Sequence, residues 1–259
     1  MFSLLNNCFG HPSIHGGRLG IGYGNLVMDG RAVMAPYYDR GAIKSFEDHF
    51  DCNAINPAWL NTLVGTDGSA AVPAVDQASG IVLTTGADAG ATMALNGSEL
   101  VSALAYDRGT GGLEFDVVIK MSRITNACVY VGLTDSISLE MPFTISAATL
   151  TSNATDGMGM LFDTAATAAT WKFVRVANDV DGAIYNTGLA PTAATYEQFH
   201  IDVDEDGSAK IYHDGKLIAN GLTGCSTSGV KLTPCVAAFS RTSTSMTVTA
   251  DYVGIRSYR

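Results

Sequence analysis

Two carboxylates stand two residues apart in the segment Leu113–Met121, whose sequence is LEFDVVIKM. Side chains of a β-strand alternate between its faces, so Glu114 and Asp116 are expected to project from one face. Paired acids on one face can flank a glycosidic bond and exchange protons with it. The rest of the strand adds no further acid, since Val118 continues the alternation and residue 119 is isoleucine. The sequence therefore favours an ordinary solvated strand face and predicts that the chain is not an enzyme.

A second acidic cluster, DVDEDG at residues 202–207, matches the start of a calcium-binding loop. The twelfth position of such a loop supplies a bidentate glutamate, but this chain has His213 there. Asp202 and Asp204 alternate along an expected strand, and Asp206-Gly207 suits a hairpin turn. The sequence therefore predicts no metal at these residues, while a calcium site elsewhere stays open.

No cofactor-binding motif stands out in the chain. The glycines Gly20, Gly22 and Gly24 lie in a glycine-rich coil rather than a strand-to-helix turn, so no dinucleotide site is expected. The five cysteines lack a CxxC spacing and favour reduced, mostly buried thiols, with a bridge between Cys225 and Cys235 as an alternative. The histidines show no metal-ligand spacing on one strand, although the first two form a weak zinc candidate; they are His11, His15, His49, His200 and His213. We predict no catalytic residue, cofactor or metal.

Composition excludes several classes of partner. The chain has 259 residues, of which 47% are hydrophobic and 15% charged, with a net charge of −10. This charge disfavours nucleic acid and anionic lipid, which both need clustered Lys and Arg. No apolar run reaches the roughly 18 residues of a membrane helix. The N-terminus lacks an early basic residue, and Leu4 and Leu5 are followed at once by two asparagines, so we expect no signal peptide and synthesis in a host cytoplasm.

Residues 1–42 differ from the rest of the chain. They are rich in glycine and carry apolar side chains without a sustained helical or strand period. Such a segment is expected to order by lying across a partner. We therefore predict an attachment arm over residues 1–42 and a folded domain over residues 43–259; the alternative is that the arm packs on its own domain. The predicted interface residues are Phe2, Leu4, Leu5, Phe9, Leu19, Ile21, Tyr23, Leu26, Tyr37 and Tyr38.

From residue 43 onward, short β-branched or alternating segments recur between Gly, Asn and Asp. The pairs Asp181-Gly182, Asp206-Gly207 and Asp214-Gly215 fit tight hairpin turns. Residues 164–170 are expected to form a loop. Strands with such regular turn signals predict a single all-β sandwich. They are expected near Ser45–Phe50, Ile81–Thr84, Thr92–Leu95, Leu113–Met121, Cys128–Leu133, Met158–Asp163, Trp171–Ala177, Ala183–Asn186, Gln198–Val203, Ala209–His213, Lys216–Ala219, Cys235–Ser240 and Met246–Arg256.

Several segments together resemble one fold family. FHIDVDEDGSAKIYHDGKLIANG, which starts at Phe199, is similar to hairpins of laminin-G-like and concanavalin A-like jelly rolls. FEDHFD, followed by Asn56-Pro57-Ala58-Trp59, resembles the opening of such domains in tailed-phage virion proteins, and ACVYVGLTDS, DGMGMLFDT and TVTADYVGIRSYR resemble later strands. The resemblance implies a concanavalin A-like jelly-roll β-sandwich from Ser45 to Arg259, preceded by an extended N-terminal arm. Such domains serve as lectins, glucanases, adhesion modules and phage capsid or fibre proteins, and the fold alone does not choose among them.

Glucanases of this family carry the pattern E-x-D-x-(x)-E, of which this chain matches only Glu114-Phe115-Asp116. A lectin-like site needs aromatic platforms beside hydrogen-bonding groups. Trp59 and Trp171 are expected in the core. The tyrosines that could supply platforms are Tyr106, Tyr130, Tyr185, Tyr196 and Tyr212.

The combined interpretation is a structural protein of a tailed-phage virion. Low charge, the absence of a catalytic constellation and the apolar arm favour a capsid decoration (cement) or head-fibre protein, whose arm binds the major capsid protein or another virion protein. The alternative is a tail-fibre or baseplate adhesin, or a lectin-like module that binds a host surface glycan. A homo-oligomer, and specifically a trimer, is implied only by the resemblance.

Overall fold

The structure is a computed structural model that describes residues 14–15, 18–19, 43–52, 54–76, 79–109 and 111–258. The chain divides into two compact units, Met1–Ile43 and Lys44–Arg259. In the first unit, β1 (Ile14–His15) pairs antiparallel with β2 (Arg18–Leu19). Apart from Leu19 in β2, the residues predicted to form the attachment interface lie outside the described part of the chain.

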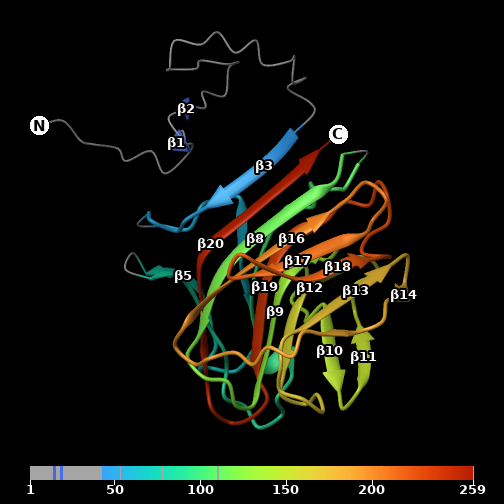
Figure 1. Ribbon diagram of the computed structural model, residues 1–259. Coiled ribbons are helices and arrows are strands. Elements are labelled where there is room, and N and C mark those ends of the chain that lie inside the picture. Colours follow the sequence, from blue (N-terminus) through green and yellow to red (C-terminus); the bar gives the residue numbers. More distant parts are fainter. Residues whose placement is uncertain are drawn as a thin grey trace, which may run out of the picture. The chain divides into compact units, whose positions relative to one another are not determined.

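Two eight-stranded sheets form the folded domain (Figure 1). The first, called the β8 sheet, has the order β18-β17-β16-β8-β20-β6-β5, and β3 also pairs with β20. Its strands are β3 (Ile43–Asp48), β5 (Ala71–Asp76), β6 (Gly80–Thr84), β8 (Leu113–Met121), β16 (Tyr196–Val203), β17 (Ala209–His213), β18 (Lys216–Leu222) and β20 (Thr247–Tyr258). The predicted all-β fold is confirmed.

The second sheet, called the β9 sheet, has the order β14-β13-β12-β9-β19-β7-β4, and β15 also pairs with β13. Its strands are β4 (Trp59–Val64), β7 (Ser98–Ser102), β9 (Ala127–Thr134), β12 (Gly157–Asp163), β13 (Lys172–Ala177), β14 (Val180–Asp181), β15 (Tyr185–Asn186) and β19 (Thr233–Ser240). Neighbouring strands are antiparallel in both sheets where their register is defined.

The core between the sheets follows from the alternation in β8, which spans the predicted residues. Five side chains of this strand are at most 2% exposed and face the β9 sheet: Leu113, Phe115, Val117, Ile119 and Met121. The residues between them are half-buried on the opposite face. Aromatic contacts link the sheets, since Trp171 lies 4.9 Å from Phe199 of β16 and 5.7 Å from Phe162 of β12, measured between ring centroids. The prediction that Trp59 and Trp171 are core residues is confirmed.

The outer face of the β9 sheet is buried as well. A hairpin of β10 (Phe143–Ser146) and β11 (Thr149–Ser152) supplies Phe143 and Ile145 to a second apolar cluster, which includes Tyr130 and Val174 of the sheet. Strands β9, β12 and β19 are therefore buried on both faces. This explains why their sequences are nearly continuous apolar runs rather than alternating ones.

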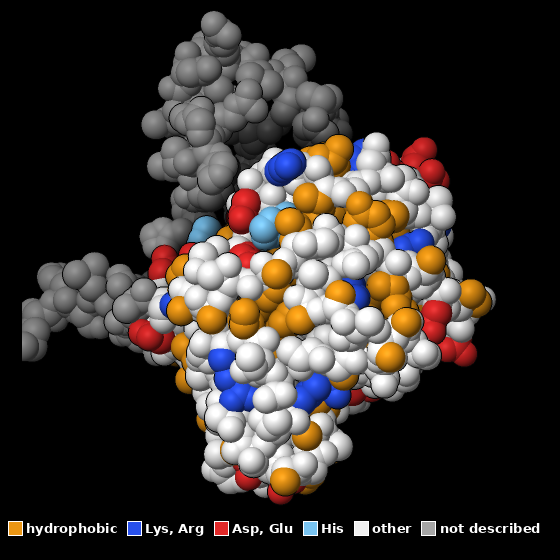
Figure 2. Space-filling model, turned by 60° about the horizontal axis from the view of Figure 1, so that its bottom comes forward, with side chains coloured by type: hydrophobic (Ala, Val, Ile, Leu, Met, Phe, Trp, Pro, Cys, Tyr) orange, Lys and Arg blue, Asp and Glu red, His pale blue; other side chains and the backbone are white. Residues whose placement is uncertain are grey.

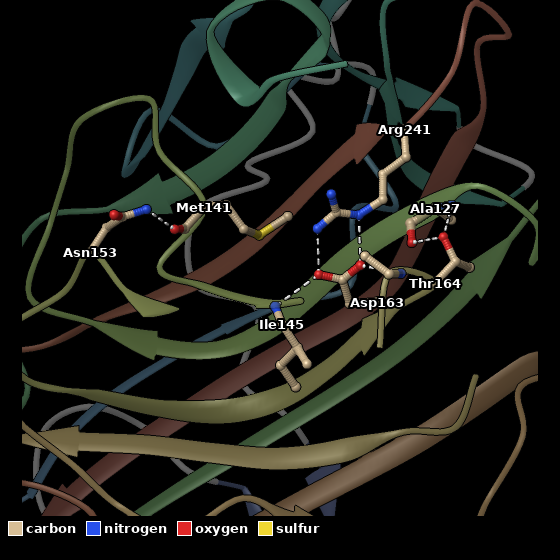
Figure 3. A network of polar contacts seen from close by, with 8 residues as sticks. Ala127, Met141, Ile145, Asn153, Asp163, Thr164 and Arg241 are labelled. Carbon is tan, nitrogen blue, oxygen red and sulfur yellow. Dashed lines mark hydrogen bonds and ion pairs between the residues drawn. The ribbon is translucent and has the colours of Figure 1, made fainter. Parts of the chain in front are cut away.

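Asp163 connects this hairpin to the sheet (Figure 3). Its fully buried carboxylate accepts hydrogen bonds from Arg241 Nε at 2.6 Å and from the amide of Ile145 at 3.0 Å. The amide of Ala165 donates to the same carboxylate at 2.9 Å. A buried carboxylate needs such partners to offset its desolvation, so this network holds β12, β10 and the segment after β19 together.

Two of the three predicted Asp-Gly turns are confirmed. Asp206-Gly207 joins β16 to β17 and Asp214-Gly215 joins β17 to β18, with φ of 81° and 75° at the two glycines. The prediction for Asp181-Gly182 is wrong, because the turn between β13 and β14 is made by Asn178 and Asp179, with φ of 51° and 61°. Asn and Asp adopt this left-handed conformation more readily than other non-glycine residues.

The segment Thr92–Leu95, predicted as a strand, belongs instead to a short helix, α1 (Met93–Asn96). The buried amide of Asn96 explains the difference, since it accepts a hydrogen bond from the amide of Asp88 at 2.7 Å and donates to the carbonyl of Ser240 at 3.1 Å. Strands β4, β5 and β7 are not among the predicted strands because their sequences show no clear alternation. Residues 164–170 form the expected loop.

Three of the five cysteines, Cys128, Cys225 and Cys235, are free and buried. The alternative bridge between Cys225 and Cys235 is wrong, because their Sγ atoms donate to different groups, the carbonyl of Leu222 and the carboxyl of Glu99. Cys52 is disulfide-bonded, against the expectation of reduced thiols.

Within the described parts of the chain, no helix is long and apolar enough to cross a membrane.

Candidate functional site

The outer face of the β8 sheet carries a continuous polar surface, which we call the open face. The side chains of Asp116, Glu114 and His200 keep 25%, 28% and 29% of their surface exposed, so a ligand can reach them while neighbouring strands hold them. Figure 2 shows histidine side chains beside acidic ones on the surface of the domain. The open face comprises Glu47, His49, Glu114, Asp116, Val118, Lys120, Tyr196, Gln198, His200, Asp202, Lys210, Tyr212, Tyr252, Gly254 and Arg256.

A row of three side chains crosses this face perpendicular to the strands. The register places His200 of β16 opposite Asp116 of β8 on one side and opposite Tyr212 of β17 on the other. His200 Nδ1 lies 2.8 Å from Asp116 Oδ1, and the rings of His200 and Tyr212 are 5.3 Å apart. The hydrogen bond to Asp116 raises the pKa of His200, against the opposing effect of burial, and the charges of Glu114 and Asp202 add to the rise.

A second group lies on β20 beside this row. Arg256 is bound by Glu47 of β3 at 2.7 Å and lies 3.6 Å from Glu114, which is its cross-strand partner in β8. The hydrogen bond that Arg256 donates to Glu47 is the first cause that raises the pKa of Arg256 further above its usual range, and the charges of Glu47 and Glu114 add to the rise. Burial, followed by the charges of Glu47 and Asp116, raises the pKa of Tyr252 to about 12. The guanidinium and its carboxylates are thus held in fixed positions next to the His200–Asp116 pair.

The acidic cluster at residues 202–207 is not arranged around a cation site. Lys210 Nζ lies 3.3 Å from Asp202 and 3.1 Å from Asp204, so a lysine occupies the space between these carboxylates. Asp206 instead accepts a hydrogen bond from the amide of Ser208 at 2.8 Å in the hairpin turn. Across the described residues, no group of three or more His, Cys, Asp and Glu side chains is placed to hold a metal ion.

Glu114 and Asp116 do project from the same face, as the alternation predicted, but they are not merely solvated. Each is paired with a basic side chain, Glu114 with the guanidinium of Arg256 and Asp116 with the imidazole of His200. Val118 follows them on the open face, opposite Tyr252. The arrangement offers hydrogen-bond acceptors, an imidazole that can donate a proton and aromatic rings on one face of the sheet. Such a surface suits an extended ligand that is rich in hydroxyl groups.

Only part of this site follows from the sequence. Of the five tyrosines considered as platforms, Tyr196 and Tyr212 lie on the open face. The other three do not. Tyr106 and Tyr130 are buried, and Tyr185 packs against the core while its hydroxyl donates a hydrogen bond to the carbonyl of Ile218. The residues missed are Glu47, His200, Tyr252 and Arg256. Alternation could have revealed those on β20, but a register shift between Ala250 and Tyr252 interrupts the period.

No protein-family model matches this chain, and no curated protein matches it. Solved structures do resemble it. A Bacillus licheniformis β-glucanase has a TM-score of 0.57 at 16% identity, and the match covers 83% of this chain and 98% of the glucanase chain. The Emp47p carbohydrate recognition domain has a TM-score of 0.55 at 14% identity, covering 85% and 99%. A prokaryotic β-1,3-1,4-glucanase (lichenase) derived from a mouse hindgut metagenome has a TM-score of 0.54 at 14% identity, covering 82% and 98%.

These likenesses show the fold: the chain is a concanavalin A-like jelly-roll sandwich, as the sequence resemblance implied. They correct the prediction that the chain is not an enzyme, because glucanases and other glycoside hydrolases are prominent among the similar structures. The lack of one particular spacing of carboxylates in the sequence does not exclude hydrolysis. The named structures give no support to a virion role.

Proposed function

We propose that the protein binds a carbohydrate chain on the open face of the β8 sheet. The observation that carries the proposal is the row of Asp116, His200 and Tyr212, which combines an acceptor, a donor and an aromatic ring on adjacent strands. Sugars present hydroxyl groups at their edges and C–H groups on their faces, so they are bound by such mixtures of polar and aromatic side chains. The carbohydrate-related names of the similar structures agree with this class of ligand.

The test is binding to a panel of β-1,3-1,4-glucan, mannan and mucin O-glycans, measured by isothermal titration calorimetry and affinity electrophoresis. At least one member should bind, and Asp116→Asn and His200→Ala should each weaken that binding about tenfold or more, because each removes a charged hydrogen-bonding partner. The control is Asp181→Asn, which removes one charge on β14 of the other sheet. Binding that survives both open-face variants contradicts the proposal, as does a panel without any binder.

Hydrolysis of the bound glycan is the second candidate function. The observation that favours it is the pair Glu114 and Asp116, two carboxyl groups on one face of β8, beside the imidazole of His200. In glycoside hydrolysis one acid protonates the leaving oxygen while a carboxylate attacks the sugar or activates water. His200, with its raised pKa, adds a proton donor next to these carboxyls.

Release of reducing ends from any panel member that binds tests this second candidate. Glu114→Gln should lower turnover about a hundredfold or more, since it removes one of the two carboxyls. A glycan that binds but yields no reducing ends over long incubation contradicts hydrolysis and leaves binding alone.

The location of the protein in a virus particle is proposed from the sequence resemblance only. On this proposal residues 1–42 attach an oligomer, a trimer by analogy with capsid jelly rolls, to the major capsid or another virion protein of a tailed phage, and the domain faces a host surface glycan. A truncation that starts at Gly41 tests it. The truncated protein should keep its glycan affinity but no longer join the particle. Incorporation at full occupancy would contradict the attachment role.

A further inference from the structure

Gly254 occupies an unusual position on the open face. It lies in β20, directly opposite Asp116 of β8 in the sheet register. Its neighbours Val253 and Ile255 point into the core, so a side chain at residue 254 would project from the open face. Gly254 is nevertheless buried, because another side chain covers it.

The side chain that covers Gly254 is that of Tyr252. A Cβ atom placed on Gly254 would stand less than 3.0 Å from the hydroxyl oxygen and Cζ of Tyr252, which is closer than real Cβ atoms approach such neighbours, and 3.1 Å from Cε1. The phenol ring therefore extends along β20 and lies over the glycine rather than standing away from the sheet. The absence of a side chain at residue 254 is what leaves room for the ring.

The surroundings of Tyr252 agree with this placement. The ring of His49 lies 4.7 Å from it at an interplanar angle of 42°, so two rings border the same part of the open face. Burial is the first cause that raises the pKa of Tyr252 to about 12, and the charges of Glu47 and Asp116 follow. A phenol that stood free in solvent would lack the first of these effects.

We infer that Gly254 is a positioning residue, which lays the ring of Tyr252 along the sheet so that it forms a platform for one sugar ring beside Asp116. This inference rests on the proposed carbohydrate binding. An aromatic ring that lies along a sheet offers its outward surface to the C–H groups of a sugar. Asp116, opposite Gly254, then lies within reach of the hydroxyl groups at the edge of the same sugar.

The substitution Gly254→Ala separates this role from a merely structural one. The atoms that a new methyl group would meet belong to the far end of the flexible Tyr252 side chain, so the ring can swing away without movement of the backbone. The matched control is Gly68→Ala, because a Cβ at Gly68 meets nothing within 4 Å and Gly68 lies in the turn between β4 and β5. Both variants are expected to fold with melting temperatures near that of the wild type.

The first measurement is the pKa of Tyr252. It is obtained by an NMR titration of protein that is labelled at tyrosine Cζ. The Tyr252 signal is assigned by its loss in Tyr252→Phe. It should titrate near 12 in the wild type and in Gly68→Ala, and should move toward the ordinary value of 10.0 in Gly254→Ala. An unchanged pKa in Gly254→Ala would overturn the positioning role.

The second measurement is affinity for the member of the β-1,3-1,4-glucan, mannan and mucin O-glycan panel that the wild type binds. Gly254→Ala and Tyr252→Ala should each weaken binding about tenfold, whereas Tyr252→Phe, which keeps the ring, should stay within about threefold. If Gly254→Ala and Tyr252→Ala keep full affinity while Asp116→Asn loses it, the Tyr252 ring is not a platform for the sugar. The proposed function then still stands. A wild type that binds no member of the panel overturns the proposed function and the platform together, while the NMR titration still decides where the ring lies.

Discussion

His200 and Asp116 face each other across β16 and β8, with Nδ1 of the imidazole 2.8 Å from Oδ1 of the carboxylate. The pair stands near the middle of the open face, next to Glu114 on the same strand as Asp116 and Asp202 on the same strand as His200. Lys210 and Tyr212 flank it from β17. The hydrogen bond to Asp116 first, and the charges of Asp116, Glu114 and Asp202 after it, raise the pKa of His200 in the folded protein, while burial opposes the rise.

The first prediction is a pH-dependent contribution of this pair to stability. The folded pKa of His200 is raised above 6.5, so the pair contributes fully below about that pH, and its contribution is lost as pH rises through the folded pKa. His200→Gln should therefore lower the melting temperature most at about pH 5.5 and least at about pH 8.5. Thermal unfolding across this range measures it. A difference that grows with pH would contradict the assigned sign.

A double-mutant cycle isolates the His200–Asp116 interaction from other effects. Asp116→Asn should cost about as much stability at low pH as His200→Gln, and the double variant should cost little more than either. Full additivity of the two losses would mean that the side chains do not interact in solution. The effect is expected to be modest, since both side chains are partly exposed and solvent screens them.

The second prediction concerns the alternation of β8. Phe115 is fully buried between the sheets, whereas Val118, on the open face, is only half-buried. Phe115→Ala should reduce the free energy of unfolding by about 3–5 kcal/mol, because it removes a large core side chain and leaves a cavity. Val118→Ala, the control, should cost less than about 1 kcal/mol. Equal costs in chemical denaturation would mean that the faces of β8 are inverted.

The fold could be predicted where one face of a strand meets water. The alternation in Leu113–Met121 and the Asp-Gly pairs at residues 206–207 and 214–215 lead directly to β8 and to the β16–β17–β18 meander. Strand β7, SELVS, could not be predicted from the sequence, because all five of its residues are buried. Its Glu99 and Ser102 side chains form hydrogen bonds with Glu140 and Thr233, which are distant in the sequence. Those partners become neighbours only after folding.

The candidate site could be predicted only in part for the same reason. Glu114 and Asp116 are visible in the sequence as two acids with strand spacing. Their basic partners, Arg256 and His200, lie far away along the chain, and only the pairing of β8 with β20 and β16 brings them together. The platform of Tyr252 depends on the glycine at residue 254, whose role appears only in the packed sheet.

The third prediction concerns Glu99, a fully buried carboxyl group on the outer side of the β9 sheet. Burial raises its pKa to about 8, against hydrogen bonds from the amide of Glu140 at 3.0 Å and the thiol of Cys235 at 3.5 Å, and the charge of Glu140 adds to the rise. Between pH 4.5 and about 8, the native protein holds a proton on Glu99 that the unfolded chain has released. The free energy of unfolding should therefore fall as pH rises through this window.

Glu99→Gln tests this directly, because glutamine stays neutral while its oxygen can still accept the Glu140 amide. The variant should be more stable than the wild type at about pH 8, by a few kcal/mol at most, since one pKa unit corresponds to about 1.4 kcal/mol. Near about pH 4.5 the two proteins should have similar stability. Urea denaturation at the two pH values measures both, and a Glu99→Gln protein with the same pH slope as the wild type would rule out Glu99 as the source.

The last prediction concerns Asp163 and Arg241, the buried ion pair that connects the β10–β11 hairpin to the sheet. Arg241→Met removes the guanidinium that pairs with this fully buried carboxylate, so the free energy of unfolding should fall by about 3–5 kcal/mol. Adding Asp163→Asn should recover much of this loss, because the asparagine oxygen can still accept a backbone amide hydrogen bond and no charge remains buried. Hydrogen exchange should locate the effect: in Arg241→Met the amides of Phe143–Ser146 should lose protection while those of β8 keep theirs. Uniform loss of protection in both sheets would show that Asp163 supports the whole domain rather than the hairpin. A double variant that does not regain stability would show that hydrogen-bond geometry, not the buried charge, determines the loss of stability.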